Sequence, residues 1–557
     1  MSTNFNRKPE KYLGLVTSGS LSKGLQVRIR SSAPLEHIQT GQFVAIESNG
    51  VRFFGMLTDV ALEATTDSIL LDPPGDDTSA LVREVLQGVY TYGDAHVDNR
   101  LALYQGDANP RPVRSIPAHF TSVYIAEETD FDAVFGSEDL FQGGKNFAIG
   151  KPLDMEIDIC IDLERFVERS NGIFGKSGTG KSFLTRLLLA GLIRADICSN
   201  LIFDMHNEYG EQAQAENKKF VKGLRSLFSQ KVQVWSLKNT RLGGSGSIDG
   251  EIFIGLNQIE VEDILLLQDE LNLNATASES AYILKEKYGD KWIVELLNGD
   301  PEQIATDSRA NIQSVKALRN KLHALKNLPF VVDHSSIDSV NQIVDNLARG
   351  KHIVIQFGKS DNMLSYILVA NIVTRIIHEK YKDKVDQYRQ SQKASDEPRR
   401  VMITIEEAHK FLTPAVAGQT IFGTIAREMR KYYVTLLVVD QRPSSIDSEI
   451  MSQIGTRVVA LINDERDIDA VFTGVSGSSG LKTVLASLDS KQQALVLGHA
   501  APMPVVIRTR PYDEAFYKQI ISGLELARST VDWDDLDPDS QEEARQKAIE
   551  EVKDLYG

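Results

Sequence analysis

Residues 175–182 read Gly-Lys-Ser-Gly-Thr-Gly-Lys-Ser, which matches the pattern G-x-x-x-x-G-K-[ST] without a mismatch. Apolar residues 172–174 precede it as a short expected strand, and residues 182–190 follow it with apolar side chains at helical spacing. In such a strand–loop–helix unit, unhindered backbone N–H groups can surround a polyanion at the positive end of the helix dipole. The pattern therefore constrains this part of the chain to an α/β fold and predicts that it binds a nucleoside triphosphate.

Two side chains of this loop have predicted roles. Lys181 would reach the β- and γ-phosphates, and the hydroxyl of Ser182 would bind Mg²⁺. The predicted ATP-binding residues are Gly175, Lys176, Ser177, Gly178, Thr179, Gly180, Lys181 and Ser182.

Size and composition limit the number of domains and the class of protein that the chain can form. Its 557 residues exceed one hydrophobic core, so about two to four domains are expected. Cys160 and Cys198 do not form a C-x-x-C pattern, which disfavours a disulfide framework or a zinc knuckle and favours a reducing cytoplasm. Because the sequence has no apolar run of about 18 residues and no signal segment, we expect a soluble cytoplasmic protein that does not enter a membrane. The formal charge of −16 argues against a nucleic-acid coat that works through its whole surface, but it is compatible with a ring whose lumen is locally basic.

The segment pattern changes along the chain. Short alternating segments separated by turns favour a small N-terminal β-barrel, and an acidic connector with an expected strand at Met155–Ile159 follows it. After the phosphate loop, strands alternate with helices, which indicates a mostly parallel sheet. The expected domains are 1–125 (β-barrel), 126–170 (connector), 171–257 (first part of the nucleotide-binding core), 258–345 (helical insertion), 346–510 (second part of the core) and 511–557 (helical arm or tail).

Particular elements are expected in the core and in the insertion. The core strands are expected at Asn200–Asp204, Val232–Leu237, His352–Phe357, Val401–Ile405, Thr435–Val439 and Arg457–Ile462, with a closing antiparallel hairpin of Gln493–Leu497 and Pro504–Arg508. In the insertion, helices are expected over Ala281–Leu297 and Ile312–Leu325.

Two adjacent carboxylates, Glu406 and Glu407, end one expected strand. Hydrolysis of a nucleoside triphosphate needs one carboxylate to order Mg²⁺ and another to activate water, both beside the phosphate loop. Successive strand residues point to opposite sides, so the two carboxylates can divide these roles. We predict Glu406 as the metal ligand and Glu407 as the general base or water-orienting residue. Glu406 is one methylene longer than the usual Asp, so we expect its contact with the metal to run through water.

A second acidic strand end supplies Asp204 and Glu208, which we regard as supporting residues. An ordinary loop with capping side chains explains the same spacing. His206 and His409 could suggest a metal pair, but no third ligand recurs at zinc-like spacing, so we reject that interpretation.

Charge on the transferred phosphoryl group is commonly stabilised by an arginine from a neighbouring subunit. Arg427–Lys431, after the Glu406–Glu407 strand, is the best candidate cluster, with Arg427 and Arg430 as the candidate arginines. Basic residues that compensate a helix C-terminus would explain this cluster equally well. Gln441, at the end of another buried strand, is placed to sense the γ-phosphate.

Taken in order, five motifs resemble those of the HerA family of hexameric DNA translocases, in the HerA–FtsK branch of P-loop ATPases. They are the phosphate loop, Phe203–Tyr209, Ile405–His409, Arg427–Lys431 and Asp440–Ser444, and the resemblance covers about residues 10–510. Two positions depart from the family pattern: Glu406 replaces the usual Asp, and Met429 stands where Gly is frequent.

The resemblance implies an α/β, RecA-like P-loop ATPase core with a HAS-like N-terminal β-barrel and a helical insertion. It implies that Lys181 and Ser182 hold ATP and Mg²⁺, that Glu407 is catalytic, and that Arg430 is the finger in trans, with Arg427 as the second choice. It also implies a homohexamer with ATP sites between subunits, double-stranded DNA in the central channel, and a partner docked on the barrel side. That partner would be a NurA-like nuclease or another effector, such as a Sir2-like subunit, in DNA end processing or anti-phage defence.

The leading hypothesis is therefore an ATP-driven translocase or helicase on double-stranded DNA, whose pore loops grip DNA phosphates. The alternative is a nucleotide-dependent ring scaffold that assembles and regulates an effector enzyme; its output would survive Glu407→Gln. A secretion or conjugation ATPase is disfavoured because no membrane segment occurs, and an ABC-type dimer because no Leu-Ser-Gly-Gly-Gln stretch occurs. We assign no DNA-binding residue, because the basic residues of 218–225 also fit a solvated surface, and Gly243–Ser247 fits a pore loop or a plain turn.

Overall fold

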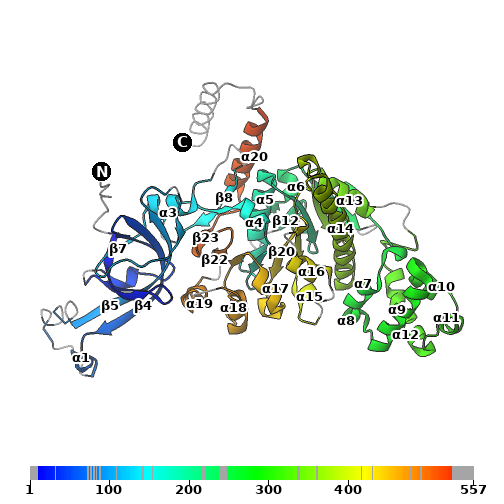
Figure 1. The fold of residues 1–557 in the computed structure, drawn as a ribbon, viewed down its shortest axis with the longest axis horizontal. Helices are drawn as coiled ribbons and strands as arrows, with labels where there is room; N and C mark the ends of the chain where they lie inside the picture. Colours follow the sequence, from blue (N-terminus) through cyan, green and yellow to red (C-terminus); the bar gives the residue numbers. More distant parts are fainter. Residues whose placement is uncertain are drawn as a thin grey trace.

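The computed structural model describes residues 11–529 except 32, 72–73, 76–77, 80–81, 83–84, 87–89, 108, 139–143, 154, 215–219, 238–247, 335–338, 359–361, 416, 419, 429–430, 476–478 and 490–491. Along the long axis of the molecule lie a β-barrel, a central α/β core and a lateral group of helices (Figure 1). The expected tail after Val531 lies outside the described residues.

The barrel is one antiparallel sheet with the strand order β2-β1-β7-β3-β4-β5-β6. An additional pairing of β2 with β5 closes the sheet, and the apolar residues that alternate along these strands fill its interior. This confirms the predicted small barrel. Its strands are β1 (Tyr12–Ser20), β2 (Gly24–Ile29), β3 (Phe43–Ser48), β4 (Val51–Ala64), β5 (Thr91–Tyr104), β6 (Arg111–Pro112) and β7 (Ser122–Ile125).

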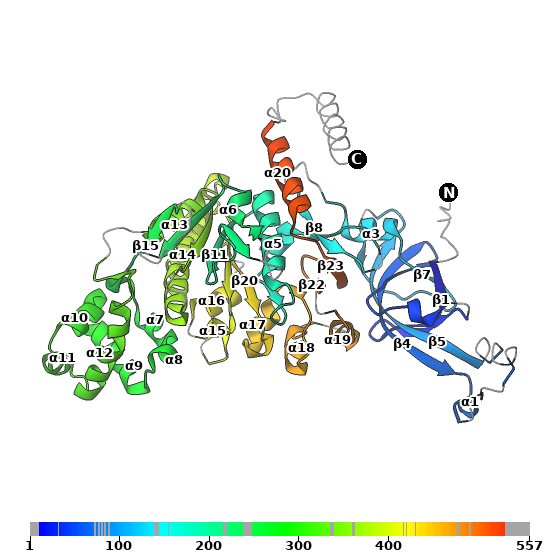
Figure 2. The same ribbon diagram turned by 180° about the vertical axis from the view of Figure 1, so that it is seen from behind.

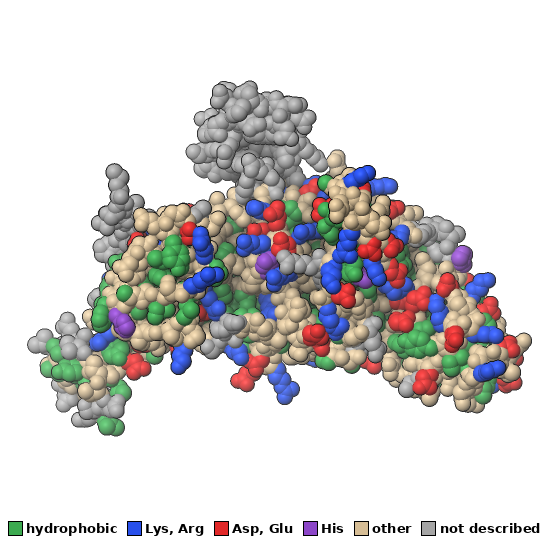
Figure 3. All heavy atoms as spheres, viewed as in Figure 1, with side chains coloured by type: hydrophobic (Ala, Val, Ile, Leu, Met, Phe, Trp, Pro, Cys, Tyr) green, Lys and Arg blue, Asp and Glu red, His purple; other side chains and the backbone are tan. Residues whose placement is uncertain are grey.

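Strands β4 and β5 continue beyond the barrel as a two-stranded arm that ends near α1 (Asp67–Leu71) (Figure 1). The arm exposes large apolar side chains: Leu62 is 81% exposed, Leu70 65% and Leu71 85%. Figure 3 shows hydrophobic side chains gathered at this end of the molecule. Contiguous exposed apolar surface of this kind marks interaction sites more often than free surface.

The core is a 12-stranded sheet with the order β15-β14-β18-β11-β19-β20-β10-β21-β22-β23-β8-β9. Neighbouring strands are parallel from β15 to β21 and antiparallel from there to β9, so the predicted mostly parallel sheet and its closing hairpin are confirmed. Its strands are β8 (Asn146–Lys151), β9 (Ile159–Asp162), β10 (Asn171–Phe174), β11 (Ser199–Asp204), β14 (Val232–Leu237), β15 (Gly250–Ile252), β18 (His352–Gln356), β19 (Val401–Glu406), β20 (Val434–Asp440), β21 (Thr456–Val459), β22 (Gln493–Gly498) and β23 (Val505–Thr509).

Two expected strands are corrected. The strand expected at Arg457–Ile462 ends at Val459, because Ala460 and Leu461 leave the ladder and pair with the backbone around the phosphate loop. The strand expected at Met155–Ile159 begins only at Ile159, since the register of β8 against β9 opposes residues 146–150 to 159–162. Residues 126–170, expected as a connector, thus supply α3 (Glu128–Phe135), the last two strands at one end of the core sheet, and α4 (Leu163–Val167).

Helices cover both faces of the core sheet (Figure 1, Figure 2). They include α5 (Lys181–Ala195), α6 (Leu224–Leu227), α13 (Ser339–Ala348), α14 (Met363–Ser391), α15 (His409–Leu412), α16 (Ile421–Glu428), α17 (Ser448–Gln453), α18 (Glu465–Val471) and α19 (Ser479–Ala486). The helix α20 (Glu514–Ser529) projects from the core near β8 (Figure 2). None of the helices in the described part of the chain combines the length and apolar character that crossing a bilayer requires.

Beyond the far edge of the sheet, the segment expected as a helical insertion packs around the buried Trp292. Its helices are α7 (Val261–Leu266), α8 (Gln268–Leu271), α9 (Ala275–Tyr288), α10 (Trp292–Asn298), α11 (Pro301–Ser308) and α12 (Ile312–Lys326). The single helix expected over Ala281–Leu297 is two helices, because the chain turns at Gly289, whose φ of 55° favours glycine. Short β12 (Gln212–Gln214) pairs with β13 (Phe220–Lys222), and β16 (Ile254–Gly255) pairs with β17 (Val331–Val332).

Candidate active site

The phosphate loop joins the end of β10 to the start of α5, and β10 lies between the parallel strands β20 and β21. Gly175, Gly178 and Gly180 have φ values of 156°, 77° and 94°, which side chains rarely adopt. A Cβ on Gly175 would lie 2.8 Å from Thr179 Oγ1 and 2.9 Å from Ala460 Cβ, so this position accepts only glycine. The glycines of the pattern are therefore required by the backbone of the loop itself.

Hydrogen bonds within the phosphate loop and to a neighbouring segment fix its conformation. The Lys181 Nζ and the Thr179 hydroxyl both donate to the carbonyl of Lys176, each at 2.8 Å. The N–H of Lys176 donates to Leu461 O at 3.2 Å, which ties the loop to the chain after β21. Burial lowers the pKa of Lys181, although nearby carboxylates, with Glu407 foremost, oppose this effect.

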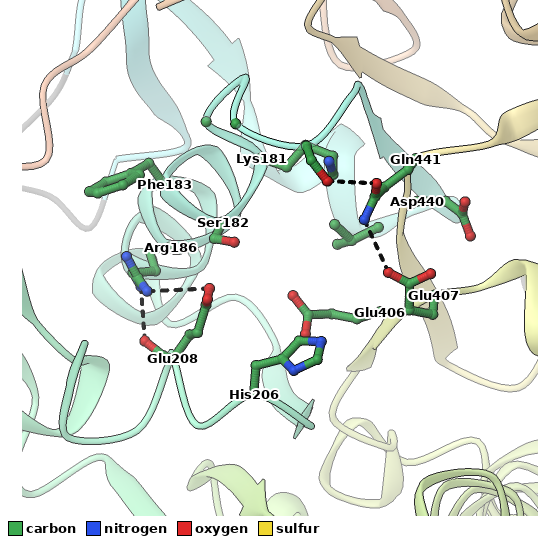
Figure 4. Close-up of a pocket in the computed structure, with 14 residues that line it drawn as sticks. Lys181, Ser182, Phe183, Arg186, His206, Glu208, Glu406, Glu407, Asp440 and Gln441 are labelled. Atoms are coloured by element: carbon green, nitrogen blue, oxygen red, sulfur yellow. Dashed lines mark hydrogen bonds and ion pairs between the residues drawn. The ribbon is translucent and has the colours of Figure 1, made fainter. Parts of the chain in front are cut away.

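A cleft of about 300 Å³ opens between the loop and the ends of β11, β19 and β20. Figure 4 shows Lys181 and Ser182 on one side of it and the carboxylates of Glu406 and Glu407 on the other. Of the predicted ATP-binding residues, five line the cleft, whereas Gly175, Lys176 and Thr179 form the turn behind it. The complete lining is Ser177, Gly178, Gly180, Lys181, Ser182, Phe183, Arg186, His206, Glu208, Glu406, Glu407, Val439, Asp440 and Gln441.

Glu406 ends β19 and is only 8% exposed. Its Oε1 accepts a 2.6 Å hydrogen bond from the Tyr209 hydroxyl, while its Oε2, also buried, has no partner among the described residues. Burial raises the pKa of Glu406 to about 8. A buried carboxylate with one unpaired oxygen, across the cleft from Ser182, fits a Mg²⁺ site, because a bound Mg²⁺ would stabilise the ionised form that burial disfavours.

Glu407 follows β19 with a φ of 48°, a left-handed conformation that is strained for a residue with a side chain. Its Oε1 accepts a hydrogen bond from Gln441 Nε2 at 3.3 Å, and Gln441 Oε1 accepts one from the Ser177 hydroxyl at 2.8 Å. Gln441 thus connects Glu407 to the phosphate loop, at the end where a γ-phosphate would lie. Its predicted sensing role stays a prediction.

Asp440 ends β20 with a fully buried side chain and organises the backbone around Glu407. It accepts the N–H of His409 and the N–H of Arg442, both at 2.7 Å, and its Oδ2 lies 3.0 Å from His409 Nδ1. Burial opposes ionisation of Asp440, but these hydrogen bonds outweigh it and lower its pKa. The same bond to Asp440 raises the pKa of His409.

The predicted supporting residues have different roles. Asp204 accepts the N–H groups of Glu208, Tyr209 and Gly210 at 2.6–3.2 Å and therefore caps the turn after β11. This is the capping interpretation left open above, and Asp204 does not line the cleft. Glu208 does line it and forms an ion pair with Arg186 at 3.6 Å (Figure 4).

Of the two candidate arginines, the structure describes Arg427, which does not line the cleft. Arg427, near the end of α16, pairs with Glu449 of α17 at 3.4 Å within the same chain. Arg430 lies outside the described residues, as do Lys218, Lys219 and the Gly243–Ser247 loop. The described basic side chains that line the cleft are Lys181 and Arg186.

Sequence reasoning missed four residues that shape the site: Tyr209, Arg186, Asp440 and His409. Each belongs to a segment already singled out, but its contact runs to another strand or helix. The spacing between Tyr209 and Glu406, for example, carries no signal of their hydrogen bond, which joins the ends of two neighbouring strands.

A glycine-rich loop between a strand and a helix, with buried acidic residues at the ends of adjacent parallel strands, defines the protein as a P-loop ATPase. The sequence profile "Helicase HerA, central domain" matches residues 147–377. The chain is 24% identical over 486 residues to the DNA double-strand break repair helicase HerA of Sulfolobus acidocaldarius, covering 86% of this chain and 90% of the relative. It is 22% identical to the protein of the same name from Pyrococcus furiosus, over 68% of this chain and 72% of the relative.

Together these matches show that the chain is similar to HerA helicases over most of its length, with the central-domain match at residues 147–377. Among solved structures, the plasmid coupling protein TrwB in complex with ADP and Mg²⁺ is similar with a TM-score of 0.45 and 11% identity, over 69% of this chain and 92% of that one.

Proposed function

We propose that this protein is an ATP-driven translocase or helicase that works on double-stranded DNA as a homohexameric ring. The observation that carries the proposal is the convergence of Lys181, Ser182, Glu406 and Glu407 on one cleft. The relatives' name, DNA double-strand break repair helicase, supports DNA as the substrate and DNA end processing as the setting.

In the proposed reaction, Lys181 and the backbone N–H groups of residues 178–182 bind the β- and γ-phosphates. Glu407 orients a water molecule and accepts its proton as the oxygen–phosphorus bond forms and the bond to ADP breaks. Ser182 and Glu406 would hold Mg²⁺, which would neutralise charge on the phosphate oxygens. Gln441 would exchange its bond to Ser177 for one to the γ-phosphate.

The charge balance of the cleft favours completion by a second copy. Glu208, Glu406, Glu407 and Asp440 line it, and among the described lining Arg186 is already engaged by Glu208. A further cation would therefore stabilise a bound triphosphate. We propose Arg430 of the adjacent copy as this group, and Arg427 as the second choice, since Arg427 would first have to leave Glu449.

We further propose that a nuclease or another effector docks on the barrel side of the ring. The exposed leucines of the β4–β5 arm, Leu62, Leu70 and Leu71, support an apolar contact there. In an anti-phage role, a nuclease-like or Sir2-like effector would dock on the same arm.

The proposal is tested by ATP turnover of the purified protein with and without duplex DNA, alongside its mass in solution. We expect a hexamer whose turnover rises with duplex DNA and falls with added salt, because each phosphate contact releases counterions. Lys181→Ala should bind ATP poorly and show no turnover. A monomer that hydrolyses ATP at a rate indifferent to DNA would contradict the proposal.

A further inference from the structure

His409 is placed between two carboxylates, one of which is the proposed water-activating group. Its Nδ1 lies 3.0 Å from Asp440 Oδ2 and 3.5 Å from Glu407 Oε2. His409 begins the short helix α15, shortly after the acidic end of β19. The ring is 23% exposed, so it is packed in the wall behind the cleft rather than free in solvent.

Asp440 holds His409 by its backbone and by its ring. The backbone N–H of His409 donates to Asp440 Oδ2 at 2.7 Å, and the ring Nδ1 lies 3.0 Å from the same oxygen. Asp440 is itself immobilised, because its side chain is completely buried and its Oδ1 accepts the N–H of Arg442. The imidazole therefore cannot turn without breaking contacts to the end of β20.

Glu407 in turn is contacted on both carboxylate oxygens. Gln441 donates to Oε1, and His409 faces Oε2. This matters because Glu407 has a left-handed backbone, which persists only where the surroundings hold it in place. Such contacts restrain the carboxylate that orients the attacking water molecule. This restraint favours hydrolysis, since a displacement of about 1 Å can lower the rate about 100-fold.

Among the residues that the structure describes, the two nearest lysines in the sequence and in the site do not offer this contact. Lys410, the next residue, turns toward Glu270 at 4.0 Å. Lys181 donates to the loop carbonyl of Lys176 and belongs to the phosphate site. Among the described residues, His409 is the cationic or hydrogen-bonding partner that the structure gives to Glu407 Oε2.

We propose that His409, anchored by Asp440, is a positioning residue for ATP hydrolysis that fixes the Glu407 carboxylate from the side opposite Gln441. The inference rests on the proposed function, in that Glu407 must be the group that activates water. It predicts an effect on turnover and not on nucleotide binding, because His409 does not line the cleft.

The test compares His409→Ala, His409→Asn and the control Lys410→Ala by ATP turnover at saturating ATP with duplex DNA, and by binding of a fluorescent ATP analogue. We expect His409→Ala to lower kcat by about 10- to 100-fold and to change nucleotide affinity by less than about threefold. The Asn side chain can donate one N–H to Asp440 as the ring does, so His409→Asn should recover about tenfold of the loss. Lys410→Ala should behave as the unchanged protein.

Glu407→Gln, measured in parallel, distinguishes failure of the role proposed for Glu407 from failure of the role proposed for His409. If Glu407→Gln retains turnover, the assigned role of Glu407 fails, and the inference fails with it. If Glu407→Gln abolishes turnover while His409→Ala keeps kcat within about twofold of the unchanged protein, only the inference is overturned. Loss of nucleotide affinity in proportion to kcat would also overturn it. Where His409→Ala does not fold, His409→Asn decides: at unchanged thermal stability its kcat should stay within about tenfold of the unchanged protein, and a larger loss would overturn the proposal.

Discussion

At the scale of single residues, two buried carboxylates at the ends of neighbouring strands have opposite surroundings. Asp204, at the end of β11, is saturated by three backbone N–H donors. Glu406, at the end of β19, has one oxygen bonded to Tyr209 and the other without a partner among the described residues. The first carboxylate holds a turn together, whereas the second is poised for a ligand.

This difference predicts opposite effects of removing each charge. Asp204→Ala leaves three buried N–H groups unpaired and should destabilise the protein by about 3 kcal/mol or more. Glu406→Gln removes a group whose ionised form is disfavoured by burial, so the thermal midpoint should stay the same or rise while ATP turnover is lost. Thermal unfolding and ATP turnover of both variants test these two predictions. A stable, active Asp204→Ala protein would contradict the capping role of Asp204.

A pH effect is predicted at His352 in β18, which does not line the cleft. Burial lowers its pKa from 6.5 to about 3, and Asn200 donates its side-chain N–H to the neutral ring. The unfolded chain therefore binds a proton that the folded chain refuses between these values, so stability is fully present above pH 6.5 and is lost as the pH falls below it. Over the step from pH 7 to pH 5 this amounts to about 2 kcal/mol.

Replacing His352 by Gln should therefore reduce the drop in thermal midpoint between pH 7 and pH 5. His323, an exposed residue of α12, provides the control, and His323→Gln should leave that drop unchanged. An equal drop in His352→Gln and in the unchanged protein would mean that the ring is not held neutral.

At the scale of elements, the insertion is fastened to the core by a buried ion pair. Arg375 of α14 contacts the fully buried Asp263 of α7 at 2.9 Å and donates to Gln258 O at 2.7 Å. Asn371, one turn earlier, donates to the same carboxylate at 2.5 Å. These contacts join the start of the insertion to α14 of the core.

Removing this arginine should loosen the insertion selectively. Arg375→Ala leaves the Asp263 carboxylate buried without its cation, at a cost of about 3–5 kcal/mol. Hydrogen exchange should then accelerate over α7–α12 more than in the core strands. Arg389→Ala is a matched control on the same helix, because its pair with Asp386 is half-exposed and worth about 0–1 kcal/mol. Uniform acceleration throughout the chain would contradict a local fastening role.

Strand and helix positions were largely predictable, because the apolar pattern decides them. Core strands such as β19 and β20 were found within one or two residues of their ends. The errors arose where the boundaries of an element depend on more than its own apolar pattern. The register against β8 sets the start of β9 at Ile159, and the turn at Gly289 divides one expected helix into two. In the site, the phosphate loop and Glu406–Glu407 follow from local spacing, but the Tyr209, His409 and Asp440 contacts depend on how the strands are ordered in the sheet.

At the scale of the whole molecule, the proposed ring predicts complementation between inactive copies. If one copy supplies the phosphate loop and Glu407 while its neighbour supplies an arginine, Lys181→Ala and Arg430→Ala copies should regain part of their turnover when mixed. Mixed rings contain some subunit interfaces in which both Lys181 and Arg430 are present. If each variant still forms rings but no mixture regains turnover, the sites do not lie between subunits, and Arg427→Ala in place of Arg430→Ala tests the second candidate.

Movement along DNA is the most direct consequence of a ring in which ATP hydrolysis is coupled to a duplex in the channel. It is measured by displacement of a third strand from a triplex placed some distance from a free duplex end. The unchanged protein should release the third strand in the presence of ATP and Mg²⁺, and Glu407→Gln should bind ATP without releasing it. Release that proceeds equally in Glu407→Gln, or DNA-stimulated turnover without any release, would contradict an ATP-driven DNA translocase.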